Sequence, residues 1–210
     1  MILSSARGAK IPDAQMREAG PSFRPARRED ASILAELVNY AGEGMPLYLW
    51  SKLAGTHETA WEVGRMRAAR ESGSFSYRNT TVLNHDGRSV GCLIGYEIAD
   101  EKMPVPPDTP GMFVPLQELE NEAPGTWYVN VLAVLPDHRS RGFGSDLLRL
   151  ADERGRELGK RGMSVIVSNS NSGARRLYEK HGYREAGRRK MIKEGWINEG
   201  QEWVLLTKAL

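Results

Sequence analysis

The sequence predicts a single α/β domain built around one mixed β-sheet. In the second half of the chain, strand-like stretches alternate with stretches of helical period. Two strands joined by a helix pair in parallel through a right-handed crossover. In the first half, residues 82–98 have the pattern of a hairpin, whose strands pair antiparallel. A chain of 210 residues is long enough to bury the core of such a domain.

The first residues contain the boundary between an expected tail and the folded domain. Residues 1–22 are rich in small and polar side chains and have no sustained period, so we predict a flexible N-terminal tail. The single domain then spans residues 23–210. It opens with a short strand at Ser22–Pro25. A helix follows that begins near Asp30, because the apolar residues after it recur with the 3.6 period.

The remainder of the first half consists of loops, a helix and the hairpin. Glycines end the first helix in the loop 41–46, and a second helix is predicted around residues 59–72. The hairpin turns at residues 84–87. Six of the eleven prolines lie between residues 101 and 125, which predicts a long loop with one helical turn at 116–120. Loops of this length are often functional.

The second half of the chain has the clearest periodicity. In the helix expected at 143–159, the apolar residues Phe143, Leu147, Leu150, Ala151 and Leu158 lie on one face. The predicted elements are a strand at 127–134, a helix at 143–159, a strand at 163–167, a helix at 172–181 and a last strand at 203–206.

The composition excludes several classes of protein. The formal net charge is only +2, from 29 basic and 27 acidic residues, so we expect neither nucleic acid nor a membrane surface as a partner. The single cysteine, Cys92, rules out an intrachain disulfide and a cysteine-based metal site, and we expect no metal. The chain shows neither the apolar run of a signal peptide nor the roughly 20 apolar residues of a membrane span. A cytoplasmic location is therefore expected.

The stretch 131–145 carries the strongest chemical signal. A strand ends at Pro136, a short basic loop follows, and a helix opens on the Gly-Phe-Gly of residues 142–144. The free N–H groups and the positive dipole end of a helix N-terminus form an anion site, which glycines allow an anion to approach closely. Arg139 and Arg141 add positive charge. The residues alone thus predict a diphosphate cradle, and the alternative is a junction whose glycines merely ease a tight turn.

Two other phosphate cradles are excluded. A Walker loop needs Gly-x-x-x-x-Gly-Lys followed by Ser or Thr, which is absent. A dinucleotide fingerprint needs a third glycine where Leu147 stands.

Two motifs resemble those of a known family. Residues 139–144, Arg-Ser-Arg-Gly-Phe-Gly, match the Arg/Gln-x-x-Gly-x-Gly/Ala signature of the GNAT superfamily of N-acetyltransferases, with Val134-x-Pro136 before it. The segment 170–183 is similar to the second signature of that family, in the same order and at the usual separation. The resemblance is specific over residues 126–187. It implies a mixed, mostly antiparallel sheet that is splayed at the cofactor site, with helices on both faces.

The resemblance also implies an activity. GNAT enzymes transfer an acetyl group from acetyl-CoA to a primary amine by direct attack within a ternary complex. The acceptor here would be a small molecule or a peptide, and a homodimer is left open. The alternative class is a non-catalytic module that binds acyl-CoA as a sensor or regulator of a partner.

Individual residues acquire expected roles from the resemblance. The main chain of the strand before the cradle would bind the pantetheine arm, and the N–H groups of the cradle would hold the diphosphate. Asn171 would contact the cofactor arm or cap the helix that follows it. Tyr178 resembles the general acid that protonates the departing CoA thiolate, and its alternative role is that of an aromatic core residue. The cofactor-binding candidates are Leu132, Ala133, Val134, Arg139, Ser140, Arg141, Gly142, Phe143, Gly144, Ser145 and Asn171.

The resemblance does not identify the general base. Where some family members carry a glutamate, this chain has Tyr128 and Ile166. Glu43 and Glu118 are candidates, and each also fits a solvated surface charge; our hypothesis is that Glu43 positions the amine or relays its proton. Carboxylates beside aromatic rings suit an amine-bearing acceptor. The expected acceptor-side residues are Glu43, Tyr48 and Trp50 in one segment and Glu118, Glu120 and Glu122 in another.

Overall fold

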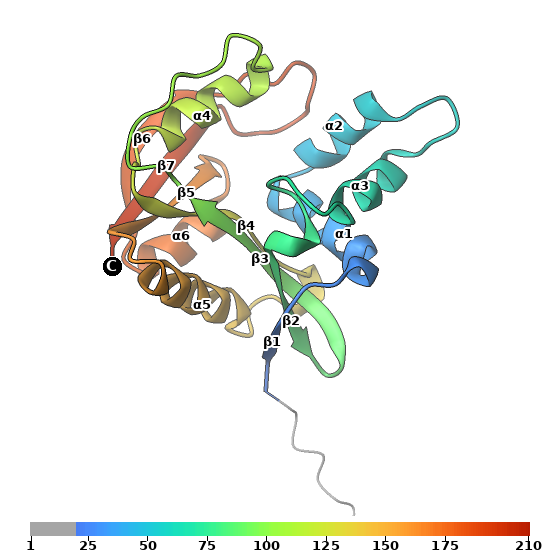
Figure 1. Cartoon of the computed structure of the whole chain (residues 1–210), viewed down its shortest axis with the longest axis horizontal. Helices are drawn as coiled ribbons and strands as arrows, with labels where there is room; N and C mark the ends of the chain where they lie inside the picture. Colours follow the sequence, from blue (N-terminus) through green and yellow to red (C-terminus); the bar gives the residue numbers. More distant parts are fainter. Residues whose placement is uncertain (1–19) are drawn as a thin grey trace, which may run out of the picture.

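The computed structural model describes residues 20–210, which form one seven-stranded sheet flanked by helices (Figure 1). The predicted tail therefore lies outside the described residues except at its end, where the first strand begins at Ser22. The strands are β1 (Ser22–Pro25), β2 (Thr80–His85), β3 (Arg88–Glu97), β4 (Thr126–Val134), β5 (Gly162–Ser168), β6 (Arg184–Lys190) and β7 (Glu202–Ala209). The α-helices are α1 (Ala31–Ala41), α2 (Met45–Leu53), α3 (Ala60–Ala68), α4 (Val114–Glu120), α5 (Phe143–Glu157) and α6 (Ser172–Lys180).

The sheet is mixed and mostly antiparallel, as predicted. Its strand order is β1-β2-β3-β4-β5-β7-β6. Every neighbouring pair is antiparallel except β4 and β5, which are parallel and joined by α5. This single crossover places the N-terminus of α5 beside the C-terminal end of β4.

The two parallel strands pair over only part of their length. Residues 126–129 pair with 162–165, and the ladder then stops although both strands continue. A β-bulge precedes the separation, because Ile94 and Gly95 of β3 pair with Val131 and Val129, which leaves Asn130 as an extra residue in β4. A bulge bends its strand and increases the local twist. The sheet is therefore splayed between β4 and β5, in agreement with the expected fold.

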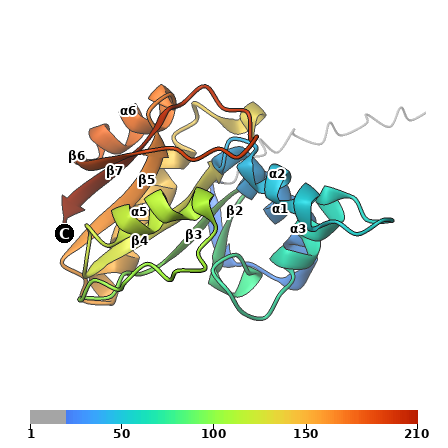
Figure 2. The ribbon, with the colours of Figure 1, turned by 90° about the horizontal axis from the view of Figure 1, so that it is seen from above.

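Helices cover both faces of the sheet (Figure 2). On one face, α5 and α6 share a core with residues such as Leu147, Leu148 and Tyr183. On the other face, α1, α2 and α3 cover β2 to β4, and α4 covers β5 to β7. Residues of α2 pack against both groups. The splay lies beneath the boundary between these two groups.

Some local elements differ from the prediction. The loop 41–46 is shorter, because α2 begins at Met45 with Pro46 in its first turn, where proline is tolerated. Strand β6 was not predicted, because its sequence Arg-Glu-Ala-Gly-Arg-Arg-Lys carries almost no apolar residue. As an edge strand that pairs only with β7, it needs none.

No helix between residues 20 and 210 has both the length and the hydropathy that crossing a bilayer requires.

Candidate active site

A cavity of about 740 Å³ opens where β4 and β5 diverge. Its walls come from both faces of the sheet. Phe143 and Tyr178 belong to the core under α5 and α6, whereas Ile166 and Trp203 belong to the core under α4. The cavity is therefore lined from both faces of the sheet.

The N-terminus of α5 forms one end of this cavity. The N–H groups of residues 140–144 make no backbone hydrogen bond within the described part of the chain. Gly142 has a φ of +88°, a left-handed conformation that glycine adopts without strain. At Gly144, an added Cβ would lie 2.9 Å from Leu177 Cδ2, so this glycine lets α5 approach α6. The free N–H groups and the helix dipole together form an anion site.

The two arginines of the cradle have different positions. Arg139 lines the cavity, donates from Nε to the Val134 carbonyl at 3.2 Å, and lies 5.9 Å from the centroid of the Tyr40 ring. Arg141 is exposed, donates to the Asp137 carbonyl at 3.4 Å, and does not line the cavity. The structure therefore brings Arg139, but not Arg141, together with the other predicted cofactor residues.

The strand residues 132–134 lie along the gap. They follow the last parallel pair, Val129 with Val165, so the edge of β4 that faces β5 has no partner strand there. Such an edge can bond an extended molecule in the manner of an added strand.

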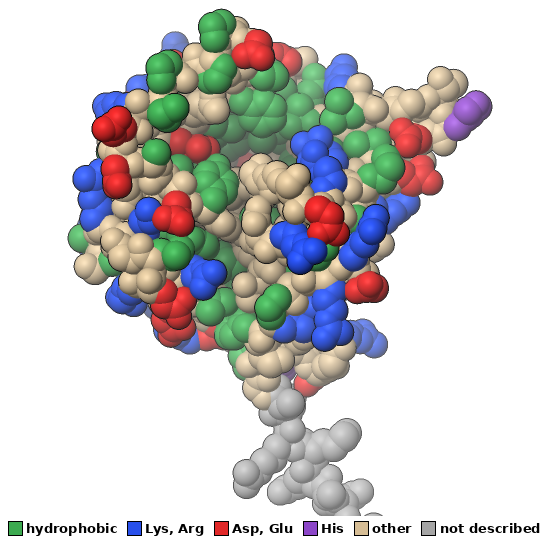
Figure 3. All heavy atoms as spheres, viewed as in Figure 1, with side chains coloured by type: hydrophobic (Ala, Val, Ile, Leu, Met, Phe, Trp, Pro, Cys, Tyr) green, Lys and Arg blue, Asp and Glu red, His purple; other side chains and the backbone are tan. Residues whose placement is uncertain are grey.

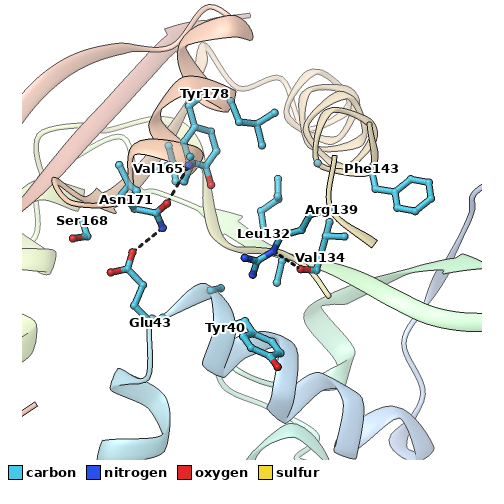
Figure 4. A pocket seen from close by; sticks show the side chains of 18 of the residues that line it. Tyr40, Glu43, Leu132, Val134, Arg139, Phe143, Val165, Ser168, Asn171 and Tyr178 are labelled. Carbon is cyan, nitrogen blue, oxygen red and sulfur yellow. Dashed lines mark hydrogen bonds between the residues drawn. The ribbon is translucent and has the colours of Figure 1, made fainter. Parts of the chain in front are cut away.

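Tyr178 combines both of its expected locations. Its ring is buried in the core, with its centroid 5.5 Å from that of Tyr183. Its hydroxyl has no hydrogen-bond partner among the described residues, and the oxygen is not sealed from solvent. Figure 4 shows the hydroxyl pointing into the cavity. Burial raises the pKa of Tyr178, so the phenol is a neutral proton donor at physiological pH.

Glu43 is held firmly at the opposite side of the cavity (Figure 4). Its Oε1 accepts a hydrogen bond from Asn171 Nδ2 and its Oε2 accepts one from Asn198 Nδ2, each at 2.7 Å. Its carbonyl accepts from Trp196 Nε1 at 3.2 Å. Its φ of +52° is left-handed and therefore strained for a residue with a side chain. Strained backbone of this kind clusters at functional sites.

Asn171 caps α6 and orients Glu43 at the same time. Its Oδ1 accepts from the Ala174 N–H at 3.0 Å, which is the predicted N-cap. Its amide nitrogen is engaged by Glu43. Asn198, the second partner, comes from the loop between β6 and β7 and was missed, since no motif or period marks that loop.

Ser145 is the last residue of the predicted cradle. Its Oγ lies 2.9 Å from His181 Nε2, so α5 is linked to the end of α6. Burial lowers the pKa of His181, which favours the neutral imidazole in this contact.

Other predicted residues lie away from the cavity. Trp50 is 3% exposed and packs with Trp61 and Phe75, so it belongs to the core rather than to the acceptor side. Glu118 and Glu122 both form ion pairs with Arg189 and do not line the cavity, contrary to their expected place on the acceptor side. Tyr48 and Glu120 do not line it either. Within residues 20–210 there is no group of three or more His, Cys, Asp or Glu side chains that could hold a metal ion.

Three solved structures with a similar fold are acetyltransferases. An acetyltransferase is 22% identical, with a TM-score of 0.62 over 90% of this chain and 98% of that chain. A GNAT acetyltransferase from Elizabethkingia anophelis with acetyl-CoA bound is 17% identical, with a TM-score of 0.58 over 90% and 98%. An N-acetyltransferase from Staphylococcus aureus Mu50 is 18% identical, with a TM-score of 0.59 over 89% and 100%.

The sequence itself identifies the family. No curated protein matches it. The model of the Acetyltransferase (GNAT) family, however, matches residues 47–183, which is more than half of the chain. That range includes the splayed strands, the N-terminus of α5 and Tyr178. The chain therefore belongs to the GNAT family and is an acyl-CoA-dependent acetyltransferase.

Proposed function

We propose that this protein transfers an acetyl group from acetyl-CoA to a primary amine, which attacks the thioester directly in a ternary complex. One observation carries the proposal. The cavity between β4 and β5 has an anion site on one side, the Tyr178 hydroxyl within it and the oriented Glu43 carboxylate on the other. A binding module would need the anion site but not the proton donor.

The described residues fit acetyl-CoA. The free N–H groups of residues 140–144, at the positive end of α5, would hold the diphosphate, and Arg139 would add charge at its edge. The unpaired edge of β4 at residues 132–134 would bond the amide groups of the pantetheine arm. The arm then extends along the splay toward Tyr178.

Tyr178 would act on the departing sulfur. In the reaction, the amine nitrogen forms a bond to the acyl carbon, the carbon–sulfur bond breaks, and the amine loses a proton. The phenol donates its proton to the thiolate as the carbon–sulfur bond breaks, and the proton that the amine loses returns through water to the tyrosinate, so the residue ends the cycle in its starting state. Because burial raises the pKa of Tyr178, the phenol is protonated when the reaction begins.

Glu43 would act on the amine. Each of its oxygens accepts one amide hydrogen, and a carboxylate oxygen can accept a second. The carboxylate can therefore bind the incoming ammonium group or accept its proton through a water molecule. Asn171 and Asn198 fix the orientation of the carboxylate, so no conformational freedom of this side chain has to be lost at each turnover.

The test is a thiol-release screen with acetyl-CoA against a broad panel of small amines and peptides. We expect thiol release that depends on an amine, together with an acetylated product identified by mass. Thiol release that is equal with and without every amine would contradict the proposal. Acetyl-CoA binding without any turnover would support the sensor class instead.

A further inference from the structure

Three glutamates at α4 have different environments. Glu118 and Glu122 both form ion pairs with Arg189 of β6. Glu120 is half-buried and has no lysine or arginine partner within the described residues. Its one side-chain hydrogen bond comes from the Tyr96 hydroxyl to Oε1, at 3.1 Å. Burial raises the pKa of Glu120, as expected for a carboxyl group without a cationic neighbour.

Two tyrosine rings adjoin this carboxylate. Tyr96 and Tyr128 are cross-strand partners in β3 and β4, and their ring centroids are 5.2 Å apart at an interplanar angle of 52°. Aromatic rings beside a carboxylate favour a cation through charge pairing and cation–π contact. No cationic side chain between residues 20 and 210 occupies that position beside Glu120.

This cluster lies on the acceptor-side face of the sheet. Tyr128 pairs with Ser164, and Ile166, two residues further along β5, points to the same face and lines the main cavity. The same face is hollowed between α4 and α2, and the hollow is lined largely by hydrophobic side chains (Figure 3). Tyr128 is 5% exposed and does not line the main cavity, so of the two rings only that of the half-buried Tyr96 is open to a bound molecule.

Tyr96 and Glu120 line a second, smaller pocket of about 210 Å³ between the end of β3 and α4. That volume corresponds to about seven water molecules, enough for an ammonium or guanidinium group. No lysine or arginine lines it, whereas Glu101 does. Neither Tyr96 nor Glu120 lines the larger cavity, so the reacting nitrogen and the group bound here are different groups.

We propose that Glu120, with the ring of Tyr96, binds a second, positively charged group of the acceptor. The preferred acceptors are then molecules with two cationic groups, of which one is acetylated and the other is held at Glu120. The inference rests on the proposed amine acetylation and specifies its substrate class. Glu120 is a specificity residue in this scheme, while Tyr178 and Glu43 act at the reacting atoms.

The test compares aliphatic α,ω-diamines with the monoamines of the same chain length. We expect the wild type to show a kcat/KM for the best diamine on the order of 10- to 100-fold above that for its monoamine, as for a charge-assisted contact. Glu120→Gln should abolish this ratio, mainly through the KM for the diamine. Its carbonyl can still accept the Tyr96 hydrogen bond, so the fold should persist.

Glu122→Gln is the matched control, since Glu122 is paired with Arg189 and lines neither of the two pockets. It should keep the wild-type ratio. A wild type without any preference for diamines, or an equal loss in both variants, would overturn the inference. If no amine is acetylated, the proposed function fails instead. Glu120 is then tested by calorimetric titration of 1,6-diaminohexane into the protein, where equal binding by wild type and Glu120→Gln contradicts the role.

Discussion

Replacing Tyr178 with phenylalanine isolates the hydroxyl group from the rest of the residue. The ring packs in the core, and the hydroxyl has no hydrogen-bond partner among the described residues. The substitution therefore breaks no protein hydrogen bond and leaves no cavity, so the free energy of unfolding should change by less than about 1 kcal/mol. The loss of a general acid typically lowers turnover by about 100- to 10,000-fold. Activity and stability should thus separate.

Tyr183→Phe is the control for this experiment. Tyr183 lies beside Tyr178, but its hydroxyl is sealed in the core without a partner and does not line the cavity. Removing a buried, unsatisfied hydroxyl should raise the free energy of unfolding by roughly 1 kcal/mol and leave turnover near the wild-type value.

The assays are thiol release at saturating acetyl-CoA, calorimetric titration of acetyl-CoA and denaturant unfolding. Tyr178→Phe should bind acetyl-CoA with nearly wild-type affinity and lose turnover. Unchanged turnover under conditions where chemistry limits the rate would return Tyr178 to a purely structural role. An equal loss in Tyr183→Phe would show that core packing, rather than the proton donor, controls the rate.

Three further predictions concern charge and backbone. Burial raises the pKa of four of the seven tyrosines, so these four keep their protons in the folded protein. The free energy of unfolding should be full below the unfolded pKa of about 10 and fall as the pH rises above it, and the tyrosinate absorbance of these four residues should appear only as the protein unfolds. These tyrosines are Tyr96, Tyr128, Tyr178 and Tyr183. Glu43→Gln should raise the KM for the amine or lower kcat while the KM for acetyl-CoA is unchanged, and unaltered amine kinetics across the pH range would exclude its role. Gly142→Asp places a carboxylate at the anion site on a left-handed backbone, so calorimetry should show weaker acetyl-CoA binding, and equal affinity would contradict the cradle.

Strong local patterns account for what could be predicted. The strand Thr126–Val134 is an almost continuous apolar run, the helix Phe143–Glu157 follows the 3.6 period, and the short motif between them indicated the family. Strand β6 has no such pattern, because its position at the sheet edge requires no apolar face. The bulge at Asn130 also escaped prediction, since an extra residue in a strand is defined by its partner strand.

Some residues of the candidate site could likewise be predicted from local sequence, and others could not. Glycines and arginines near an expected helix start can be found from local sequence, and so can Asn171 as a cap. The contact of Glu43 with Asn198 spans 155 positions, and nothing local to either residue indicates it. The exclusion of Trp50 from the acceptor side likewise depends on tertiary packing. Contacts between distant loops arise only once the sheet has placed their ends.

The extra residue at Asn130 sets the phase of the rest of β4. Val129, before the bulge, faces the core beneath α5, whereas Val131 and Ala133, after it, face α1. If the same residues formed a strand without a bulge, 129, 131 and 133 would all lie on one face. Deleting this one residue would remove the bulge and leave a regular alternation, in which Val131 and Ala133 still face α1. A single deletion within β5, whose pairing has no bulge, would instead turn the side chains that follow it to the opposite face. In a library of single-residue deletions, the loss of Asn130 should therefore be tolerated better than the loss of a residue within β5. The bulge is a point where the strand can change its length without exchanging inside and outside.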